Sequence, residues 1–283
     1  MDNKILITGA TGNIGKELIK ALKSKNVNFV ALTTKDEKIE DVETIKADFA
    51  DIESLKNAMK GVSTLFLLLP SHPDAIKFGE NAINVAKECG VNHIVRSSGS
   101  FANPNSGLFL EKLLGITDKY LKESGINYTI TAPSCFMQNF CTTMLNDYKS
   151  GAIYQSAGEG KISWVDVRDI AAVNVEVLLN PENFTNKELI ITGQESLNYQ
   201  ETINQLNEIT EKETKYVAIT KEFATQTLVG LNFPQFFIDL IISLNESISL
   251  GHFEKLTNTV ETVTGKKPIA FKQFVADYKN IWL

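Results

Sequence analysis

A glycine-rich segment near the start of the chain constrains its fold more than any other feature. Residues 4–15 read Lys-Ile-Leu-Ile-Thr-Gly-Ala-Thr-Gly-Asn-Ile-Gly, a short apolar run followed by Gly9, Gly12 and Gly15 at three-residue spacing. Apolar residues then recur with a helical period, so the glycines lie between a buried strand and a helix. Such a turn brings the backbone close to a pyrophosphate, which the N–H groups of the helix N-terminus hold. The segment therefore predicts a dinucleotide-binding unit rather than a turn that needs glycine only for its backbone angles.

Composition narrows the class of protein. The chain has 283 residues, 43% of them hydrophobic and 22% charged, which suits one large α/β domain or a domain with a smaller lobe. A formal net charge of −6 with interspersed signs argues against a nucleic-acid partner. Cys89, Cys135 and Cys141 cannot all pair and none lies in a CxxC motif, which is typical of reduced thiols. With no signal peptide and no apolar run of ~20 residues, we expect a soluble, cytoplasmic protein with no membrane partner.

The first half of the chain alternates between strand and helix patterns. After the first unit, strands are predicted at 27–32, 44–47, 64–69, 93–97 and 127–131, and helices at 51–61, 73–89 and 109–123. Such alternation implies right-handed crossovers. The fold class is therefore predicted to be α/β, a Rossmann-type doubly wound parallel sheet.

The pattern changes after about residue 133. Helices are predicted at 136–149 and 166–179, a strand at 188–192, and a mostly helical remainder from 199 with a strand-like stretch at 215–219. We interpret 1–133 as the dinucleotide-binding domain and 134–283 as a smaller, mostly helical substrate lobe that returns one or two strands to the sheet. The lobe would form the far wall of a substrate pocket. The apolar stretch 233–244 is interpreted as buried packing, with a lid or the face of a homodimer as alternatives.

Seven segments carry a family resemblance. They are TGATGNIG at 8–15, ADF at 47–49, LLLPS at 67–71, RSSGS at 96–100, SGINYTI at 124–130, MQNF at 137–140 and VDVRDIA at 165–171. In order and spacing the chain resembles the NmrA-like family of atypical short-chain dehydrogenases/reductases, which includes quinone reductases, triphenylmethane reductases and redox-sensing regulators. The resemblance covers nearly the whole chain and implies a Rossmann fold, a small substrate lobe and a bound nicotinamide dinucleotide.

The glycine motif and the resemblance together predict the residues that contact the cofactor. They are Gly9, Thr11, Gly12, Asn13, Ile14, Gly15, Thr33, Thr34, Lys35, Asp48, Phe49, Leu69, Pro70, Ser97, Ser98, Pro133 and Ser134. Of these, Asp48 resembles the family's adenine-side contact but is equally compatible with a simple turn.

The end of the second strand bears on the choice of dinucleotide. A carboxylate there would bind the ribose 2′-OH of NAD and repel a 2′-phosphate. This chain has Thr33, Thr34 and Lys35 instead, whose hydroxyls and ammonium suit a phosphate, so NADP(H) is expected in preference to NAD(H). Asp36 and Glu37 follow and could fold back toward the ribose, and Lys35 could also be a solvated loop residue.

The proton donor of ordinary short-chain reductases is missing. These enzymes carry a Tyr-x-x-x-Lys pair on the helix before the sixth strand. Aligning Asp118 with the acidic residue that often follows the pair places Leu114 at the lysine position and Leu110 at the tyrosine position. Lys112 lies about 200° around the helix from Leu114, and Tyr120 lies beyond the window. Hydride transfer to a quinone, dye or nitro compound needs no such donor, whereas reduction of a ketone would be difficult.

Other candidate residues surround the expected reaction centre. Ser98, at the end of the fifth strand, is the candidate catalytic residue through contact with nicotinamide or substrate, with ordinary loop polarity as the alternative. The expected pocket residues are Phe101, Leu114, Cys135, Phe136, Met137 and Phe140, which suit a flat apolar substrate. Asp166 and Asp169 are interpreted as a cap and a first-turn charge of a helix. His93 and His252 have no carboxylate or cysteine at ligand spacing, so no metal site is predicted.

Two functions fit these features. The first is an NADPH-dependent reductase of quinone-like or dye-like aromatic acceptors, acting by direct hydride transfer. The second is a non-catalytic regulatory protein of the NmrA type that senses NADP(H) and signals to a protein partner. The aromatic residues of the expected pocket favour the reductase with a small aromatic substrate.

Overall fold

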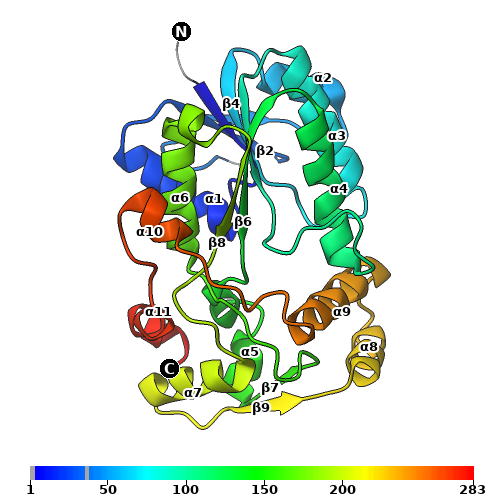
Figure 1. Ribbon diagram of the computed structural model, residues 1–283, viewed down its shortest axis with the longest axis vertical. Coiled ribbons are helices and arrows are strands. Elements are labelled where there is room, and N and C mark those ends of the chain that lie inside the picture. The colour runs from blue at the N-terminus through cyan, green and yellow to red at the C-terminus, as the bar shows by residue number, and fades with distance from the viewer. Residues whose placement is uncertain (1–3, 36–37) are drawn as a thin grey trace.

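The strands form a parallel sheet with the strand order of a Rossmann domain (Figure 1). The computed structural model describes residues 4–35 and 38–283. Among them, seven strands pair in parallel in the order β3-β2-β1-β4-β5-β6-β8. These are β1 (Lys4–Ile7), β2 (Phe29–Thr33), β3 (Thr44–Lys46), β4 (Val62–Leu67), β5 (His93–Ser97), β6 (Asn127–Pro133) and β8 (Lys187–Ile191). The predicted doubly wound sheet is confirmed. Its order reverses between β1 and β4, and ligands of such sheets bind beside the carboxyl ends at this point.

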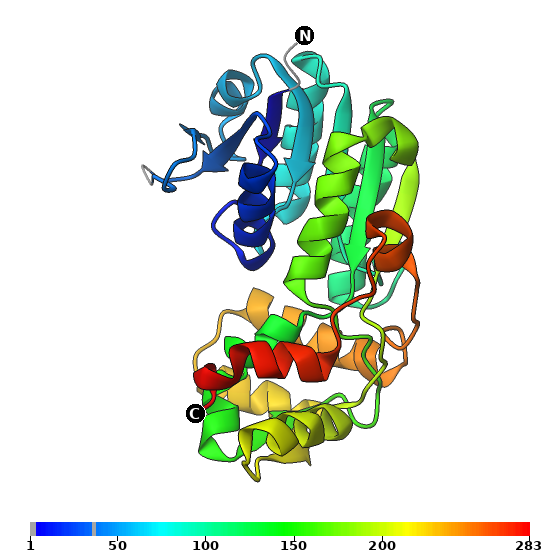
Figure 2. The ribbon, with the colours of Figure 1, turned by 90° about the vertical axis from the view of Figure 1, so that its left-hand side faces the viewer.

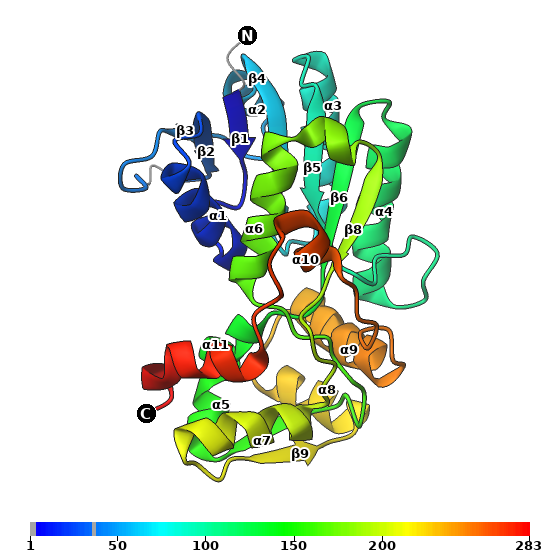
Figure 3. The same cartoon turned by 60° about the vertical axis from the view of Figure 1, so that its left-hand side comes forward.

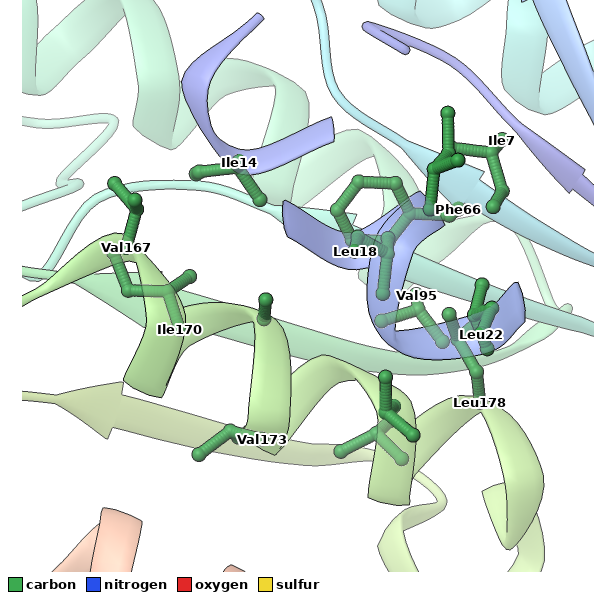
Figure 4. Packing of buried hydrophobic residues seen from close by; sticks show 14 of the residues in the cluster. Ile7, Ile14, Leu18, Leu22, Phe66, Val95, Val167, Ile170, Val173 and Leu178 are labelled. Atoms are coloured by element: carbon green, nitrogen blue, oxygen red, sulfur yellow. The ribbon is translucent and has the colours of Figure 1, made fainter. Parts of the chain in front are cut away.

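Helices cover both faces of the sheet. One face carries α1 (Asn13–Ser24), α6 (Val167–Leu179) and α10 (Thr259–Thr264), and the other carries α2 (Ile52–Ala58), α3 (Ala75–Glu88) and α4 (Phe109–Glu123). Leu18 and Leu22 are one helical turn apart on α1 and fully buried. Figure 4 shows them between Phe66 of the sheet and Leu178 of α6. This packing fixes the position of α1 and therefore of the glycine-rich turn that precedes it.

A mostly helical lobe lies beyond the carboxyl ends of the strands (Figure 2). Its elements are η1 (Met137–Cys141), α5 (Leu145–Ser150), β7 (Ala152–Gln155), α7 (Tyr199–Thr210), β9 (Lys215–Ala218), α8 (Lys221–Gly230), α9 (Gln235–Ser249), α11 (Phe271–Tyr278) and η3 (Lys279–Ile281). The lobe has its own aromatic core, in which the ring centroid of Phe140 lies 5.1 Å from that of Trp164 and 5.4 Å from that of Phe271.

The chain passes between the sheet and the lobe several times (Figure 3). It enters the lobe after β6 and returns to the sheet as α6, the short η2 (Pro181–Phe184) and β8. The chain then enters the lobe again and forms α7, β9, α8 and α9. It returns to the sheet as α10, which packs against α6, and it ends in the lobe with α11 and η3. Within residues 4–35 and 38–283, no helix has the length and apolar character to span a membrane.

Two features of the lobe differ from the sequence prediction. The helix predicted at 136–149 is divided into η1 and α5, and Thr142 between them has non-helical backbone angles (φ −129°, ψ −89°). Phe136, where the helix was predicted to begin, is extended, because residues on either side of it pair with Val165: Met137 N–H donates to Val165 O and Val165 N–H to Cys135 O, both at 2.9 Å. The strand-like stretch at 215–219 becomes β9, which pairs with the unpredicted β7 in a separate two-stranded sheet. β8 joins the main sheet, as predicted.

A histidine is buried inside the sheet. His93 begins β5, is 4% exposed, and its Nε2 lies 2.9 Å from Oγ1 of Thr129 on β6. Burial lowers the pKa of His93 to about 4, because the charged imidazolium would lose its hydration. The folded protein therefore holds a neutral ring at pH values where an unfolded chain would bind a proton.

The free energy of unfolding should decrease as the pH falls from about 6.5 to about 4. In this window the unfolded chain takes up a proton at His93 that the folded protein does not. The size of the pKa shift limits the resulting decrease in the free energy of unfolding to about 3 kcal/mol. In His93→Gln this part of the decrease should vanish, measured by urea denaturation at each pH. His72→Gln, at an exposed loop histidine, is the matched control. The same slope in His93→Gln and in the wild type would contradict the prediction.

Candidate functional site

The three glycines of the N-terminal motif have different structural roles. Gly9 has φ +66°, a left-handed conformation that favours glycine. Gly15 lies in the first turn of α1, where a Cβ would stand 2.2 Å from the carbonyl oxygen of Gly9. Gly12 is different, because its φ of −79° suits any residue and a Cβ there would meet only Gly9 O at 3.4 Å. Gly9 and Gly15 are thus required by the fold, whereas Gly12 leaves space beside the turn.

The N-terminus of α1 faces that space without a capping side chain of its own. The N-cap is Gly12, and the first turn, 13–16, contains no acidic residue. Thr11, Gly12 and Asn13 are exposed, whereas Ile14 and Gly15 are buried. Uncapped N–H groups and the positive end of a helix dipole bind anions, so this turn can hold a pyrophosphate.

The loop after β4 is tied to the loop after β1. The hydroxyl of Thr8 accepts from Leu68 N–H at 2.8 Å and lies within donating distance of the carbonyl oxygens of Leu68 (2.9 Å) and Phe66 (3.1 Å). Leu69 and Pro70 follow, half-buried and exposed, at the point where the strand order reverses. A dinucleotide on the glycine turn would pass this loop.

The end of β2 presents two polar residues to solvent. Thr34 and Lys35 are exposed, whereas Thr33 is buried and donates its hydroxyl to the carbonyl of Lys35 at 2.9 Å. Asp36 and Glu37, which could fold back toward the ribose, lie outside the described residues.

The loop after β3 forms a turn. Asp48 Oδ1 accepts from Ala50 N–H at 2.8 Å. This hydrogen bond is the one expected if Asp48 is a turn residue, the alternative to a contact with adenine. The ring of Phe49 is buried, and its carbonyl accepts from the Asn81 side chain at 2.8 Å. Contact of Asp48 with an adenosine stays a prediction.

Ser98 belongs to a buried polar network at the end of β5. Its hydroxyl donates to Asp118 Oδ2 at 2.5 Å, and Asp118 Oδ1 lies 3.5 Å from Nε of Arg96, which is 2% exposed. Burial raises the pKa of Asp118, whereas Arg96 and the Ser98 hydroxyl oppose the rise. Donation to Asp118 leaves the serine oxygen as an acceptor. The hydroxyls of Ser97 and Ser100 are buried without a partner among the described residues, which suits a polar ligand nearby.

Sequence reasoning did not identify Arg96 and Asp118 as partners of Ser98. A signal was present, because Arg96 follows the apolar pair Ile94-Val95 within a strand of the predicted parallel sheet, and a buried arginine needs a carboxylate. Its partner is 22 positions away on α4, and only the fold brings them together.

Helix α4 places leucines near this network. A Cβ on Gly99 would stand 3.0 Å from both Leu114 and Phe101, so these two side chains flank the end of β5. Tyr120 instead donates its hydroxyl to Asn84 of α3 at 2.9 Å and faces away from the sheet edge. Lys112 is exposed.

The other predicted pocket residues differ in burial: some are half-buried, and the rest belong to the core of the lobe. The Phe101 ring centroid lies 4.3 Å from that of Phe253. Cys135 and Phe136 are half-buried beside Val165, and burial raises the pKa of the Cys135 thiol to about 12, which favours the protonated thiol at neutral pH. Met137 and Phe140 are buried in the lobe core. Their contact with a substrate stays a prediction.

Residues at the end of β6 connect the sheet to the lobe. Pro133 and Ser134 are buried; Ser134 N–H donates to Ile191 O at 2.9 Å, and its hydroxyl accepts from Ser163 at 3.0 Å. Asp166 caps α6 by accepting from Arg168 N–H at 2.8 Å, and Asp169 lies in the first turn, so both interpretations are confirmed.

A cavity of about 790 Å³ lies in the lobe, and none of the predicted pocket residues is among the described residues that line it. It is lined by residues of η1, α5, β7, α7, α8 and α9. Ile241 and Leu244, in the stretch interpreted as buried packing, line it, while Phe237 of the same stretch is exposed. The sequence could not indicate this cavity, because its walls come from segments more than 100 residues apart.

The fold and the glycine turn define a dinucleotide-binding protein, and comparison with known proteins narrows the class. The chain belongs to the NmrA-like family, whose sequence profile matches residues 1–280, which confirms the predicted resemblance. It is 33% identical over 275 residues to an NAD(P)H azoreductase of Xenophilus azovorans, covering 95% of this chain and 96% of that protein.

Two solved structures are also similar. One is the NADPH-dependent quinone oxidoreductase QOR2 of Escherichia coli with bound NADPH, at a TM-score of 0.87 and 25% identity over 97% of this chain and 99% of that one. The other is the triphenylmethane reductase of Citrobacter sp. with NADP(H), at a TM-score of 0.84 and 25% identity, with the same coverage of both chains.

Gly12→Val should abolish dinucleotide binding in a protein that still folds. The backbone angles of Gly12 suit valine, and its Cβ would come no closer than 3.4 Å to another part of the protein, at Gly9 O, but its side chain fills the space beside the α1 N-terminus. Loss of two charge-assisted hydrogen bonds to phosphate raises Kd by about 100-fold or more. Titration calorimetry measures the affinity, and circular dichroism checks the fold.

Two other glycine variants serve as controls for Gly12→Val. Gly107→Val, at an exposed glycine with open space around it, should bind normally. Gly15→Ala should lower the melting temperature, because its Cβ meets the Gly9 carbonyl. A folded Gly12→Val protein with unchanged affinity would show that the phosphates bind elsewhere.

Proposed function

We propose that the protein is an NAD(P)H-dependent oxidoreductase that reduces quinone-like or dye-like aromatic compounds by direct hydride transfer. The observation that carries the proposal is the uncapped N-terminus of α1, open at Gly12 and directed toward the lobe from the point where the strand order reverses. The azoreductase, quinone oxidoreductase and triphenylmethane reductase that the chain resembles support the class of reaction and of acceptor.

The residues present fit a nicotinamide dinucleotide. The glycine turn would hold the pyrophosphate, and Thr34 and Lys35 would hold a 2′-phosphate. The unpaired hydroxyls of Ser97 and Ser100 and the acceptor oxygen of Ser98 lie at the end of β5, where they suit the polar groups of the nicotinamide end. When bound in its reduced form, this cofactor supplies the hydride.

The side chains beside β5 favour acceptors that need no protein acid. Leu114 lies beside Gly99, the residue after Ser98, and the Tyr120 hydroxyl is bonded to Asn84 of α3. Hydride transfer to a quinone gives a hydroquinone anion that water can protonate, and transfer to a cationic dye gives a neutral product that needs no proton, whereas a ketone needs a positioned acid. Cysteines that remain thiols fit our proposal of a cytoplasmic location.

A panel of quinones, azo dyes and triphenylmethane dyes tests the proposal through oxidation of NADPH followed at its absorbance band. Oxidation that depends on the acceptor is expected. Tight binding of NADP(H) with no turnover of any acceptor would instead identify a cofactor-sensing regulatory protein.

The protein should bind NADP(H) more tightly than NAD(H). Lys35 is exposed at the end of β2, where its ammonium can pair with a 2′-phosphate. Lys35→Ala should weaken NADPH binding by about tenfold, the loss of one charge-assisted hydrogen bond, and leave NADH binding unchanged in calorimetric titration. Lys38→Ala, at another exposed lysine of the same loop, is the control. Equal affinity of the wild type for both cofactors would refute the assignment.

Chemistry should not depend on a side-chain acid. Ser98→Ala should lower kcat only a few-fold, through poorer placement of the nicotinamide or substrate, whereas loss of an essential acid costs about 100-fold or more. Tyr120→Phe and Lys112→Ala should change kcat less still, in steady-state kinetics on an active acceptor. A collapse of kcat in Tyr120→Phe with normal cofactor affinity would restore a tyrosine-based mechanism and carbonyl substrates.

A further inference from the structure

The Ser98 hydroxyl is held in place from two directions at the end of β5. The backbone N–H of Ser98 donates to the carbonyl oxygen of Thr131 on β6 at 2.8 Å, and its hydroxyl donates to Asp118 Oδ2 of α4 at 2.5 Å. Ser98 is half-buried, whereas Asp118 is buried behind it. Because both its backbone and its side chain are bonded, the serine oxygen has a fixed position at the carboxyl edge of the sheet.

Regular secondary structure explains why Asp118 meets Ser98. Successive side chains of a strand point to opposite faces, so Arg96 and Ser98 share the face of β5 that α4 covers. On α4, Asp118 follows Leu114 by about one helical turn, and the two side chains reach Ser98 and its neighbour Gly99. The carboxylate is therefore directed at the strand end by a helix rather than by a loop.

A buried arginine favours the ionised form of Asp118. Nε of Arg96 lies 3.5 Å from Asp118 Oδ1, and Nη1 of Arg96 donates to the carbonyl oxygens of Leu67 and Ser97 at the ends of β4 and β5. A guanidinium keeps its proton in a protein. Within the part of the chain that the structure describes, no other carboxylate pairs with Arg96. Protonation of Asp118 would therefore leave a buried positive charge without a counter-ion.

This arrangement fixes the polarity of Ser98. An ionised carboxylate only accepts hydrogen bonds, and a serine hydroxyl has a single hydrogen. That hydrogen is directed to Asp118, so the oxygen of Ser98 has only lone pairs to offer to a ligand. A ligand group beside it must donate an N–H or an O–H, because a carbonyl would place one oxygen lone pair against another.

The nicotinamide end of the cofactor carries groups of both kinds. Its carboxamide has an NH2 group, which donates, and a carbonyl oxygen, which accepts, and rotation about one bond exchanges their positions. A serine free to donate or to accept would tolerate both orientations. A serine that only accepts selects the orientation in which the NH2 group faces it.

We propose that Asp118 is a positioning residue of the cofactor site. By taking the hydroxyl hydrogen of Ser98, it makes Ser98 bind the NH2 group of the nicotinamide carboxamide and so determines how the carboxamide is turned. The proposal rests on the proposed function, since it concerns the cofactor of that reaction. Asp118 acts through Ser98 and does not itself touch the cofactor.

Three oxidised dinucleotides that differ only in the carboxamide test this role. NADP⁺ has the NH2 group and the carbonyl, its thionicotinamide analogue keeps the NH2 group but has sulfur in place of the oxygen, and its 3-acetylpyridine analogue has a methyl group in place of NH2. Titration calorimetry of the wild type, without an acceptor, should give similar Kd values for the first two. The Kd of the acetyl analogue should be about tenfold higher, because Ser98 then loses its donor.

Substitutions show whether Asp118 sets this preference through Ser98. Ser98→Ala should weaken binding of NADP⁺ about tenfold and leave the acetyl analogue unaffected, which abolishes the preference. In Asp118→Asn the amide can donate to Ser98, whose hydroxyl can then donate to the carbonyl that NADP⁺ and the acetyl analogue share, so their affinities should become nearly equal. Glu123→Gln, at an exposed carboxylate in the last turn of α4, is the matched control and should keep the preference.

A double variant keeps the test valid if Asp118→Asn does not fold. Replacing the pair by apolar residues, Arg96→Met together with Asp118→Leu, leaves no unpaired buried charge. The Ser98 hydroxyl then has no fixed partner and should no longer distinguish NADP⁺ from the acetyl analogue. Circular dichroism checks the fold of each variant. A purely structural role of Asp118 would weaken binding of all three dinucleotides by the same factor and leave their ratio unchanged.

Failure of this inference differs from failure of the proposed function. Equal affinity of the wild type for NADP⁺ and the acetyl analogue, or an unchanged preference in folded Ser98→Ala, Asp118→Asn or double-variant protein, overturns the role of Asp118 even if NADPH oxidation is observed. A preference that is lost in these variants supports it even if no acceptor is turned over, in which case the proposed function alone fails. Absence of binding of all three dinucleotides overturns both.

Discussion

The close approach of α1 to the end of β1 is the constraint on which the rest of the site depends. Gly15 packs so tightly on the carbonyl of Gly9 that even a methyl group would not fit. Leu18 and Leu22 then fix the helix between the sheet and α6. The N–H groups at the start of α1 consequently have a fixed position and direction. A phosphate-binding turn needs this rigidity, because a helix free to tilt would lose the geometry of its anion contacts.

Two buried carboxylates join the sheet to the lobe. Glu111 of α4 accepts from Ser247 and His252 of the α9 region and from Ser106, each at 2.6 Å; burial raises its pKa, but these hydrogen bonds lower it below its usual range. Asp166 is bound by Gln138 and by the guanidinium of Arg168, which continues to Asp277 of α11 at 2.7 Å. These hydrogen bonds and ion pairs fix the position of the lobe relative to the sheet, because separating the two would leave a buried carboxylate without a partner, which costs free energy.

Local patterns in the sequence were sufficient for the sheet and for the cofactor turn. The helix predicted at 109–123 coincides with α4, and the glycine spacing identified the turn before α1. The extended conformation of Phe136, where a helix was predicted to begin, could not be predicted, because it depends on pairing with Val165, almost thirty residues away. The network of Ser98, Asp118 and Arg96 and the cavity beneath α8 were missed for the same reason. Periodicity reports which face of an element is buried, but not which distant side chain meets it.

The low burial of helix α8 determines where the sequence of this protein can vary without loss of stability. Its residues contribute almost nothing to the hydrophobic cores, so substitutions there cost little stability, whereas changes near Gly15 or Leu18 would threaten the whole fold. The wall of the cavity can therefore vary among descendants of one sequence while the cofactor turn stays the same. Substitutions in this one surface helix can therefore change the shape of the cavity without first producing an unstable protein.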